Sequence, residues 1–395
     1  MSDKILIIND ESAVLDLLKI VLSDKGYDTL GVLSGKEGLE AVSKWKPDLI
    51  LLDIMMPELD GYQVCTELKK IPEIASIPVI FLSSLSDPKD KIKGLEVGGV
   101  DFINRVTDKG ELLARVNTHL TLSHLTRALK ESNEELLQKQ KSLNEDLAAA
   151  AVIQNTLLPS PQIDISPVRA SWQCLPCELV GGDIFNMIRP DQDHLVVYIY
   201  DVTGHGVPSA MITVSVSQQI SQYAIHAKTS STPHIFSPAE VLNALDVEFP
   251  LERFNRFFSM FYMVLNLKTG AMKYSCAGHP PPVLLREGEA YKLLNANGTV
   301  VGVHEGGVFE EVDILLRVGD KLILYTDGIT EFQNREGNFY GAEPFYKLLE
   351  SYKSLPIDQM KEEIFGDLKK FGGDIKPLDD VSVLILELAS LEVKT

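Results

Sequence analysis

The first 120 residues alternate short apolar runs with stretches of helical spacing. KILIIN, DLILLDI, PVIFLSS and VDFIN are the apolar runs, and SAVLDLLKIVLSDKG is one of the helical stretches. Runs that are apolar at nearly every position are typical of strands buried on both faces of a parallel sheet. The pattern therefore predicts an α/β fold for residues 1–120, a flavodoxin-like, doubly wound sheet with helices on both faces.

Polar side chains stand at the carboxyl ends of these predicted strands, where doubly wound sheets collect their ligands. Carboxylates grouped there repel one another unless a cation joins them, and hard oxygen ligands suit Mg²⁺. With that cation in place, a carboxylate can attack a phosphoryl group and become an acyl phosphate. The residues concerned are Asn9, Asp10 and Glu11 after the first strand, Asp53 after the third, Ser83 and Ser84 after the fourth, and Arg105 after the fifth.

Residues 1–120 resemble the receiver domain of response regulators. The resemblance rests on IINDES, LLDIMMPELDG, FLSS and DFIN. It implies that a sensor histidine kinase phosphorylates Asp53. It also implies that Mg²⁺ is bound by Asp10, Asp53 and the backbone carbonyl of Met55, and that the switch residues are Ser83, Phe102 and Arg105.

Two departures from the receiver pattern bear on this expectation. The family usually has an acidic pair where this chain has Asn9-Asp10, and Lys-Pro where it has Arg105-Val106. Arginine keeps the positive charge but lacks the compact ammonium group of lysine. We expect Asp53 to remain a phosphoacceptor; the alternative is a degenerate receiver.

Residues 121–147 contain neither glycine nor proline and carry a seven-residue leucine repeat. Such a repeat indicates a helix that pairs with a second, parallel helix in a coiled coil. We therefore expect a helical coiled-coil linker and a homodimer. The alternative is a single helix that lies on a neighbouring domain. The repeat consists of Leu122, Leu129, Leu136 and Leu143, with Leu125 and Leu147 offset by three or four residues.

Residues 148–395 show a different pattern, in which strand-like runs are joined by tight turns. HLVVYIYDV, MFYMVLNLKTGAMKYSCAG, PVLLREGEAYKLL, KLILYTDG and VSVLILEL are such runs, and LKTG and REGE have the composition of hairpin turns. Helical stretches such as PSAMITVSVSQQISQYAI lie between them. The pattern predicts an α+β sandwich of antiparallel sheets flanked by helices.

Acidic residues in this segment stand where strands meet loops rich in glycine or threonine. One such residue means little, because turns use Asp constantly. Several of them at strand ends suggest convergence on one point, which needs divalent cations. Two cations about 4 Å apart can activate a water and hold a phosphoryl oxygen. The acids are Asp183 in GGDIF, Asp201 in IYDVTGHG, Asp327 in LYTDGITEF, and Asp379 and Asp380 in LDDVSVLIL.

This segment resembles the metal-dependent protein phosphatase (PPM) superfamily, in particular its stage II sporulation protein E-like group. The resemblance rests on AAAVIQNTLLP, LVGGDIFNMI, YIYDVTGHGVPSAM, YSCAGHPPPVLL, LYTDGITEF and DDVSVLIL, in that order. It implies that two Mn²⁺ or Mg²⁺ ions activate a water that attacks phosphoserine or phosphothreonine. The implied metal ligands are Asp201 between both ions, the carbonyl of Val202, Asp183 on one ion, and Asp327 with Asp379 on the other, Asp380 being the alternative to Asp379.

The stretch GGDIF also differs by one letter from GGDEF, the signature of cyclic di-GMP synthases. A synthase would carry it near the middle of its domain, whereas here it lies near the beginning, and Ile184 replaces the required Glu. The phosphatase interpretation also accounts for the GHG, TDG and DDVS blocks. One departure from the phosphatase pattern is Asn186, which stands where the family often has an acid. A weakened or binding-only pseudophosphatase is therefore the alternative.

The overall composition and charge indicate in which cellular compartment the protein is expected. A formal net charge of −19 disfavours nonspecific binding to nucleic acid or anionic membranes. No apolar run approaches the roughly 20 residues that span a bilayer, and the start MSDKILIIND lacks the layout of a signal peptide. We therefore expect a cytoplasmic protein.

Two motifs have a spacing typical of zinc sites, Cys174-x-x-Cys177 and Cys276-x-x-His279, but we expect these residues to serve packing. His205 is either a general acid or a residue that orients its loop.

Together these patterns predict a response regulator whose output domain is a protein serine/threonine phosphatase. Residues 1–120 form the receiver, 121–147 the linker and 148–395 the phosphatase. Phosphorylation of Asp53 would act through the leucine-repeat helix on the segment AAAAVIQN. The resemblance implies a phosphorylated anti-sigma-factor antagonist as the substrate. The alternative is a phosphorylation-gated binding adaptor without turnover.

Overall fold

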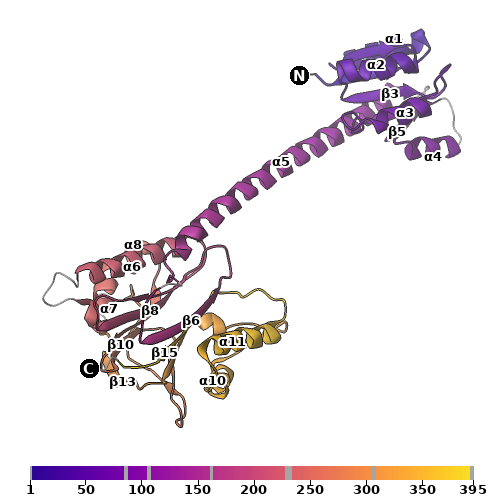
Figure 1. Ribbon diagram of the computed structural model, residues 1–395. Coiled ribbons are helices and arrows are strands. Elements are labelled where there is room, and N and C mark those ends of the chain that lie inside the picture. The colour runs from indigo at the N-terminus through magenta and orange to yellow at the C-terminus, as the bar shows by residue number, and fades with distance from the viewer. Residues whose placement is uncertain are drawn as a thin grey trace. The chain divides into compact units, whose positions relative to one another are not determined.

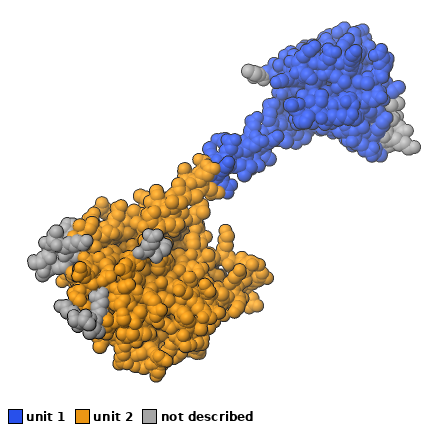
Figure 2. Space-filling view, viewed as in Figure 1, with its two compact units in different colours: residues 1–141 blue, residues 142–395 orange. Residues whose placement is uncertain are grey.

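The computed structural model describes residues 2–83, 88–104, 108–160, 163–226, 234–303 and 308–391. The chain divides into two compact units, Met1–Lys141 and Ser142–Thr395 (Figures 1 and 2). The predicted switch residue Arg105 lies outside the described residues.

The first unit is a five-stranded parallel sheet with the strand order β2-β1-β3-β4-β5. Every residue of the third and fourth strands is buried, because helices cover both faces of the sheet. The flavodoxin-like, doubly wound fold is thus confirmed. The strands are β1 (Lys4–Ile8), β2 (Asp28–Val32), β3 (Leu49–Asp53), β4 (Val79–Ser83) and β5 (Asp101–Asn104), and the helices are α1 (Ser12–Ser23), α2 (Gly35–Trp45), α3 (Gly61–Lys70), α4 (Pro88–Glu96) and the beginning of α5 (Lys109–Asn155).

Helix α5 is one continuous helix of 47 residues that begins in the first unit and ends in the second (Figure 1). The predicted linker, residues 121–147, falls wholly within it. Its leucine repeat faces solvent in the single chain: Leu122, Leu129, Leu136 and Leu143 are 53%, 73%, 62% and 58% exposed. These side chains therefore stabilise the helix only if a further surface covers them.

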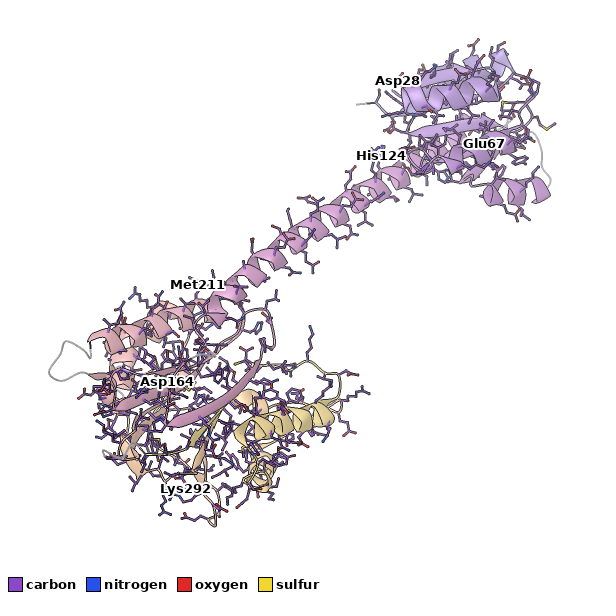
Figure 3. All side chains as sticks on the ribbon, viewed as in Figure 1. Asp28, Glu67, His124, Asp164, Met211 and Lys292 are labelled. Atoms are coloured by element: carbon purple, nitrogen blue, oxygen red, sulfur yellow. The ribbon has the colours of Figure 1, made fainter. Side chains whose placement is uncertain are left out.

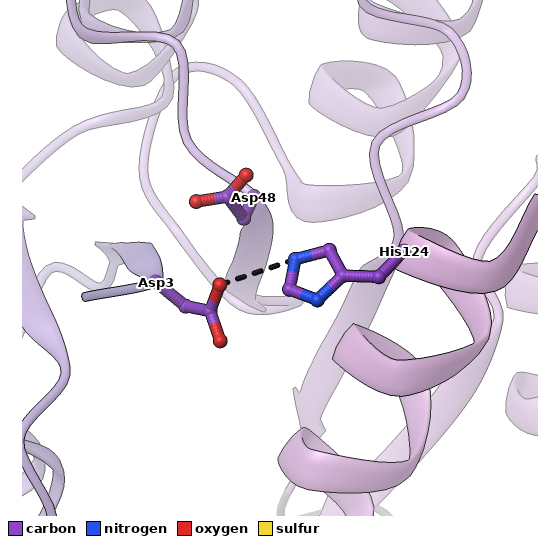
Figure 4. Close-up of side chains that lie close together, drawn as sticks. All are labelled: Asp3, Asp48 and His124. Atoms are coloured by element: carbon purple, nitrogen blue, oxygen red, sulfur yellow. Dashed lines mark ion pairs between the residues drawn. The ribbon is translucent and has the colours of Figure 1, made fainter. Parts of the chain in front are cut away.

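The part of α5 that lies in the first unit forms ion pairs at the edge of the sheet where β1 and β3 begin. His124 Nε2 lies 3.1 Å from Asp3 Oδ1 (Figure 4), and Arg127 Nη1 lies 3.8 Å from Asp48 Oδ1. Asp48 Oδ2 also accepts a hydrogen bond from the Lys4 N–H at 2.9 Å. Partly exposed ion pairs contribute about 0–1 kcal/mol each. They orient the helix, whereas buried Leu112, Val116 and Leu120 supply the apolar contact.

The second unit is a sandwich of two antiparallel sheets, with the strand orders β13-β10-β9-β8-β7 and β12-β11-β14-β15-β6. One apolar core lies between the sheets, and two further cores lie under the flanking helices. The predicted α+β sandwich is confirmed. Its strands are β6 (Val168–Leu175), β7 (Asp183–Ile188), β8 (His194–Val202), β9 (Phe258–Asn266), β10 (Ala271–Ala277), β11 (Val283–Leu285), β12 (Lys292–Leu293), β13 (Val312–Leu315), β14 (Lys321–Tyr325) and β15 (Val381–Leu388).

The helices of this unit pack on the outer faces of the sheets. On α6 the side chain of Met211 is 64% exposed (Figure 3), whereas Val216 and Ile220 are fully buried, so the helix buries one face. The described helices include none with the combined length and hydropathy that crossing a bilayer requires. They are α6 (Val207–His226), α7 (Pro238–Glu248), α8 (Leu251–Phe254), α9 (Asp327–Thr330), α10 (Ala342–Ser351) and α11 (Ile357–Gly372), with a 3₁₀ turn at His234–Phe236.

Candidate metal centre

Two of the predicted acids stand opposite each other on neighbouring strands. Asp183, the first residue of β7, is in register with Asp201 near the end of β8, and Asp201 is in register with Ser259 on β9. Directly opposed residues of an antiparallel pair project from the same face of the sheet. The register alone therefore brings Asp183 and Asp201 together.

Three carboxylates from distant parts of the chain meet next to this pair. Oxygen atoms of Asp201, Asp327 and Asp379 all lie within 4.8 Å of one another. Asp201 comes from β8, Asp327 is the first residue of the short helix α9, and Asp379 precedes β15. The expectation that Asp327 ends a strand is wrong in detail, because β14 stops at Tyr325 and a helical turn follows. The arrangement offers a set of hard oxygen donors of the kind that Mg²⁺ and Mn²⁺ bind.

Burial, with charge repulsion added to it, disfavours the ionised form of the acids in this group. Burial, followed by the charges of Asp327 and Asp379, raises the pKa of Asp201 to about 8. Burial and the charges of Asp201 and Asp380 raise the pKa of Asp183 well above its ordinary value. The pKa values of Asp327 and Asp379 are also raised, chiefly by burial. Carboxylates in such a setting ionise together only when cations compensate their charge.

Thr326 supports this group from the second sheet. Its Oγ1 donates a hydrogen bond to Asp183 Oδ2 at 2.7 Å and accepts one from the Ser382 N–H at 3.0 Å. The hydroxyl thus joins an acid of the first sheet to two adjacent strands of the second, β14 and β15.

The structure separates the adjacent acids Asp379 and Asp380. The Asp380 carboxylate is 4% exposed and accepts hydrogen bonds from the N–H groups of Cys177 at 2.9 Å and Gly182 at 2.7 Å. Asp379 is exposed and faces Asp201 and Asp327. Asp380 therefore holds the loop before β7, and Asp379 stands in the carboxylate group.

Close contacts require glycine at the two positions before Asp183. A Cβ on Gly181 would lie 2.1 Å from Asp380 Oδ2, and a Cβ on Gly182 would lie 2.6 Å from the carbonyl oxygen of Val202. Neither position can carry a side chain unless the loop moves. The double glycine in GGDIF thus permits the close approach of a carboxylate and a carbonyl to the backbone that precedes Asp183.

Gln154, in the last turn of α5, forms a contact that the sequence did not reveal. Its Nε2 donates to Gly181 O at 2.6 Å and to Thr213 Oγ1 at 3.2 Å, and its Oε1 accepts from the Gly181 N–H at 3.1 Å. A cavity of about 410 Å³ adjoins this contact, and Gln154, Asp183 and Asp380 are among its lining residues. The end of α5 is therefore coupled by hydrogen bonds to the glycine loop of the candidate centre.

Asn186, the departure from the phosphatase pattern, lies away from the acids. It is three residues after Asp183 on the same strand, so its side chain projects from the opposite face of the sheet. Its Nδ2 donates to the carbonyl of Leu157, just beyond α5, at 2.7 Å. A carboxylate could not donate this hydrogen bond. Asn186 thus holds the segment that follows α5 and is not part of the carboxylate group.

Two further charged groups border the centre. Glu331 follows Asp327 by four residues, its N–H donates to the Asp327 carbonyl at 2.8 Å, and its charge raises the pKa values of Asp201 and Asp327. Residues four apart on a helix are neighbours, so the spacing between Asp327 and Glu331 in the sequence could have indicated that Glu331 lies near the centre. His205 Nδ1 forms an exposed ion pair with Glu178 Oε1 at 2.9 Å, and its charge lowers the pKa of Asp379.

The cysteines have packing partners. Cys174 Sγ lies 3.3 Å from Ser382 Oγ, and Cys276 Sγ donates to the carbonyl of His279 at 3.2 Å. His279 Nδ1 lies 2.7 Å from Ser259 Oγ, and burial lowers its pKa to about 3. Within the described ranges, the one cysteine placed in a group of possible metal ligands is Cys177, beside Asp379 and Asp380.

In the first unit, the expected receiver residues lie at the carboxyl edge of the sheet. Asp53 is 1% exposed at the end of β3, and its Oδ1 accepts from the Met55 N–H at 3.3 Å. Asn9 is buried, and its Oδ1 accepts from the Glu11 N–H at 2.9 Å, which fixes the turn that presents the exposed Asp10. Ser83 is buried at the end of β4, and the Phe102 ring stacks on Phe81 with centroids 5.2 Å apart.

Family comparisons agree with both units. The family described as "Stage II sporulation protein E (SpoIIE)" matches residues 191–389, and the response regulator receiver domain matches residues 5–117. The chain belongs to the stage II sporulation protein E family and carries a receiver domain at its N-terminal end. It therefore combines the receiver of a response regulator with a PPM-type phosphatase domain.

Two curated relatives match part of the chain. "Probable transcriptional regulator ycf27" of Porphyridium aerugineum is 42% identical over 118 residues, which cover 30% of this chain and 48% of the relative. "Alkaline phosphatase synthesis transcriptional regulatory protein PhoP" of Bacillus subtilis is 34% identical over 140 residues, 35% of this chain and 58% of the relative. These matches thus span about half the length of the curated relatives.

A solved structure matches the second unit. The "SiaA-PP2C domain of Pseudomonas aeruginosa" superposes with a TM-score of 0.55 at 22% identity, over 63% of this chain and 98% of that domain. At this level of identity the likeness establishes the fold of the phosphatase domain.

Proposed function

We propose that the second unit is a metal-dependent serine/threonine phosphoprotein phosphatase. The observation that carries the proposal is the meeting of Asp201, Asp327 and Asp379, with oxygens within 4.8 Å of one another, beside a buried Asp183. Two Mg²⁺ or Mn²⁺ ions bound there would lower the pKa of a water and hold phosphoryl oxygens. The donor chemistry and the raised carboxylate pKa values fit such ions.

Each acid has a separate role in this proposal. Asp201 and the neighbouring carbonyl of Val202, which lies beside Gly182, would both offer oxygens to the two ions. Asp183, held by Thr326, serves one ion, while Asp327 and Asp379 serve the other. Asp380 acts through the backbone of the glycine loop. Ions held by these carboxylates would activate a water for direct attack on the phosphoester, without a covalent enzyme intermediate.

Hydrolysis of a phosphoserine peptide or p-nitrophenyl phosphate tests the proposal. We expect turnover that requires Mn²⁺ or Mg²⁺ and falls by roughly a hundredfold or more in Asp201→Asn, because the variant loses a carboxylate that would hold the cations, and these cations stabilise transition-state charge. The matched control is Asp374→Asn, whose side chain is 94% exposed. Turnover unaffected by Asp201→Asn would refute the site. Absence of turnover with a cognate phosphoprotein would favour the binding adaptor.

Phosphorylation of Asp53 by a sensor histidine kinase is proposed to control this activity through α5. Support comes from the continuity of α5 between the units and from the Gln154–Gly181 contact at its end. The switch residues would be Ser83, Phe102 and Arg105, with Mg²⁺ bound by Asp10, Asp53 and the Met55 carbonyl. Acetyl phosphate or beryllofluoride should change the phosphatase rate of the wild type and leave Asp53→Asn unchanged. An equal response of both proteins would exclude Asp53 as the acceptor.

The substrate is proposed to be a phosphoserine on an anti-sigma-factor antagonist, and the protein is proposed to act as a cytoplasmic homodimer. The substrate class rests on family membership, and the dimer on the exposed leucine repeat of α5. The chain should dephosphorylate such an antagonist much faster than an unrelated phosphoprotein carrying the same local sequence. Equal rates on both proteins would remove this substrate assignment but leave the phosphatase.

A further inference from the structure

Two aspartates and a histidine converge at the edge of the first unit where β1 and β3 begin. Ligand atoms of Asp3, Asp48 and His124 all lie within 4.8 Å of one another, and each residue is half-buried. Both carboxylates lie on the side of the imidazole ring that carries Nε2, which is 3.1 Å from Asp3 Oδ1 (Figure 4). Of the groups of possible metal ligands among the residues that the structure describes, this is the one with a histidine.

The backbone fixes the position of both aspartates. The carbonyl of Asp3 accepts a hydrogen bond from the Asp28 N–H at 2.9 Å, and the Asp48 N–H donates to the Lys4 carbonyl at 2.8 Å. The Asp48 carboxylate is oriented as well, because its Oδ2 accepts the Lys4 N–H at 2.9 Å. Such orienting hydrogen bonds are typical of carboxylates that bind metals. His124 lies on α5, whose first turns pack on this sheet, so all three residues stand on ordered elements.

A lysine and an arginine near this group compensate its charge only in part. Lys4 Nζ donates to the carbonyl of the last residue of α2 at 3.4 Å and so points away from the carboxylates. Arg127 Nη1 is 3.8 Å from Asp48 Oδ1, which is longer than a hydrogen bond, and the arginine side chain is 62% exposed. Burial, followed by the charge of Asp3, raises the pKa of Tyr27. Two carboxylates in this setting favour a further cation.

The donor set suits a transition-metal dication. An imidazole nitrogen favours ions such as Zn²⁺ over Mg²⁺ and Ca²⁺, which prefer ligands that are all oxygen. Zinc sites with three protein ligands keep a fourth position for water. A metal site also needs a path from solvent. Asp48 provides one, because it lines a groove of about 990 Å³ that runs beside α5.

We propose that Asp3, Asp48 and His124 bind a divalent transition-metal cation of the type of Zn²⁺. The three ligands come from the segment before β1, the segment before β3 and the helix α5. A bound ion would therefore fix the beginning of the predicted linker, residues 121–147, on the sheet of the first unit. The proposal does not depend on the phosphatase function or on Mg²⁺ at Asp53, because its three ligands belong to neither site.

Titration of the full-length protein with Zn²⁺ tests the proposal, with excess Mg²⁺ present to compete for the oxygen-rich sites of both units. His124→Gln should bind one Zn²⁺ roughly a hundredfold more weakly than the wild type, and Asp3→Asn should weaken the same ion by roughly tenfold or more. His119→Gln is the matched control. This histidine lies on the same helix with its Nε2 3.1 Å from Asp101 Oδ2, but among the described residues it belongs to no group of three possible ligands.

Equal Zn²⁺ stoichiometry and affinity in the wild type and His124→Gln would overturn the proposal. An equal loss in His119→Gln would also overturn it, because any imidazole of this helix would then suffice. Wild-type affinity in Asp3→Asn would exclude the three-ligand site, since the histidine would then bind the ion without that carboxylate. If His124→Gln does not fold, Asp3→Asn decides in its place.

Discussion

The side-chain amide of Gln154 pairs with both backbone groups of Gly181, as a donor to the carbonyl at 2.6 Å and an acceptor from the N–H at 3.1 Å. Gln154 is 8% exposed, so these hydrogen bonds are buried. Movement of the end of α5 within the second unit would therefore leave two buried groups of the glycine loop unsatisfied. The contact therefore links the end of α5 directly to the loop that positions Asp183.

Replacement of Gln154 by Ala should lower both stability and metal affinity. We expect the free energy of unfolding to fall by about 1–3 kcal/mol, because buried polar groups lose their partners. Mn²⁺ affinity should fall with it, since the loop before Asp183 loses its support. Urea unfolding and Mn²⁺ titration measure the two effects. Gln140→Ala, at an exposed position of the same helix, should leave both unchanged; equal Mn²⁺ affinity in both variants would contradict the proposed coupling.

The stability of the metal-free protein should depend on pH through Asp201. Its pKa is raised from 3.8 to about 8 in the folded state, so between these pH values the folded protein binds more protons than the unfolded chain. The free energy of unfolding therefore falls as pH rises through this range. Urea unfolding in EDTA from pH 5 to pH 8 should show the decline, and Asp201→Asn should make it shallower. The exposed Asp374→Asn should keep the wild-type slope.

Two glycine substitutions should act in opposite directions. Gly181→Ala places a Cβ 2.1 Å from Asp380 Oδ2, so the loop must shift, and we expect a loss of about 1–3 kcal/mol together with weaker Mn²⁺ binding. Gly366→Ala, inside α11, meets no atom within 4 Å and should gain about 0.5–1 kcal/mol from higher helix propensity. Thermal unfolding and Mn²⁺ titration compare the two. Full Mn²⁺ affinity in Gly181→Ala would argue against the close-packed loop.

The leucine repeat can be tested with two adjacent residues of α5. Leu136 lies on the repeat and Leu137 does not, and their side chains are 62% and 57% exposed. If the repeat pairs two copies, Leu136→Lys should dissociate the dimer because a lysine would enter the apolar seam. Leu137→Lys should leave it intact. Sedimentation velocity distinguishes the outcomes, and a wild type that sediments as a monomer at all concentrations would remove the proposed pairing.

The sequence predicted those parts of the fold and the centre that depend on local pattern. Fully apolar runs indicated the buried strands β3 and β4, and the alternating runs and hairpin turns indicated the antiparallel sheets. Asp183 and Asp201 could be expected to meet because each adjoins a strand and a glycine-rich loop. Alternation along β7 would also have placed Asn186 on the face opposite Asp183, away from the acids.

Other features depend on contacts between residues that local pattern does not connect. Gln154 stands next to a second polar residue, Asn155, at the end of an apolar helical segment, and its partner Gly181 is 27 positions away. Asp379 and Asp380 are chemically identical neighbours, so only the donors around each carboxylate distinguish the ligand candidate from the loop anchor.

The pairing of β15 with β6 sets the order in which a newly made chain can become functional. Val381–Leu388 joins Val168–Leu175, and Asp380 at its start holds the loop before β7. A nascent chain still attached to the ribosome before residue 379 emerges lacks both Asp379 and this anchor. Translation must therefore pass nearly the whole phosphatase domain before the carboxylate group is complete, and under the proposed function a partly synthesised chain would not act on phosphoproteins.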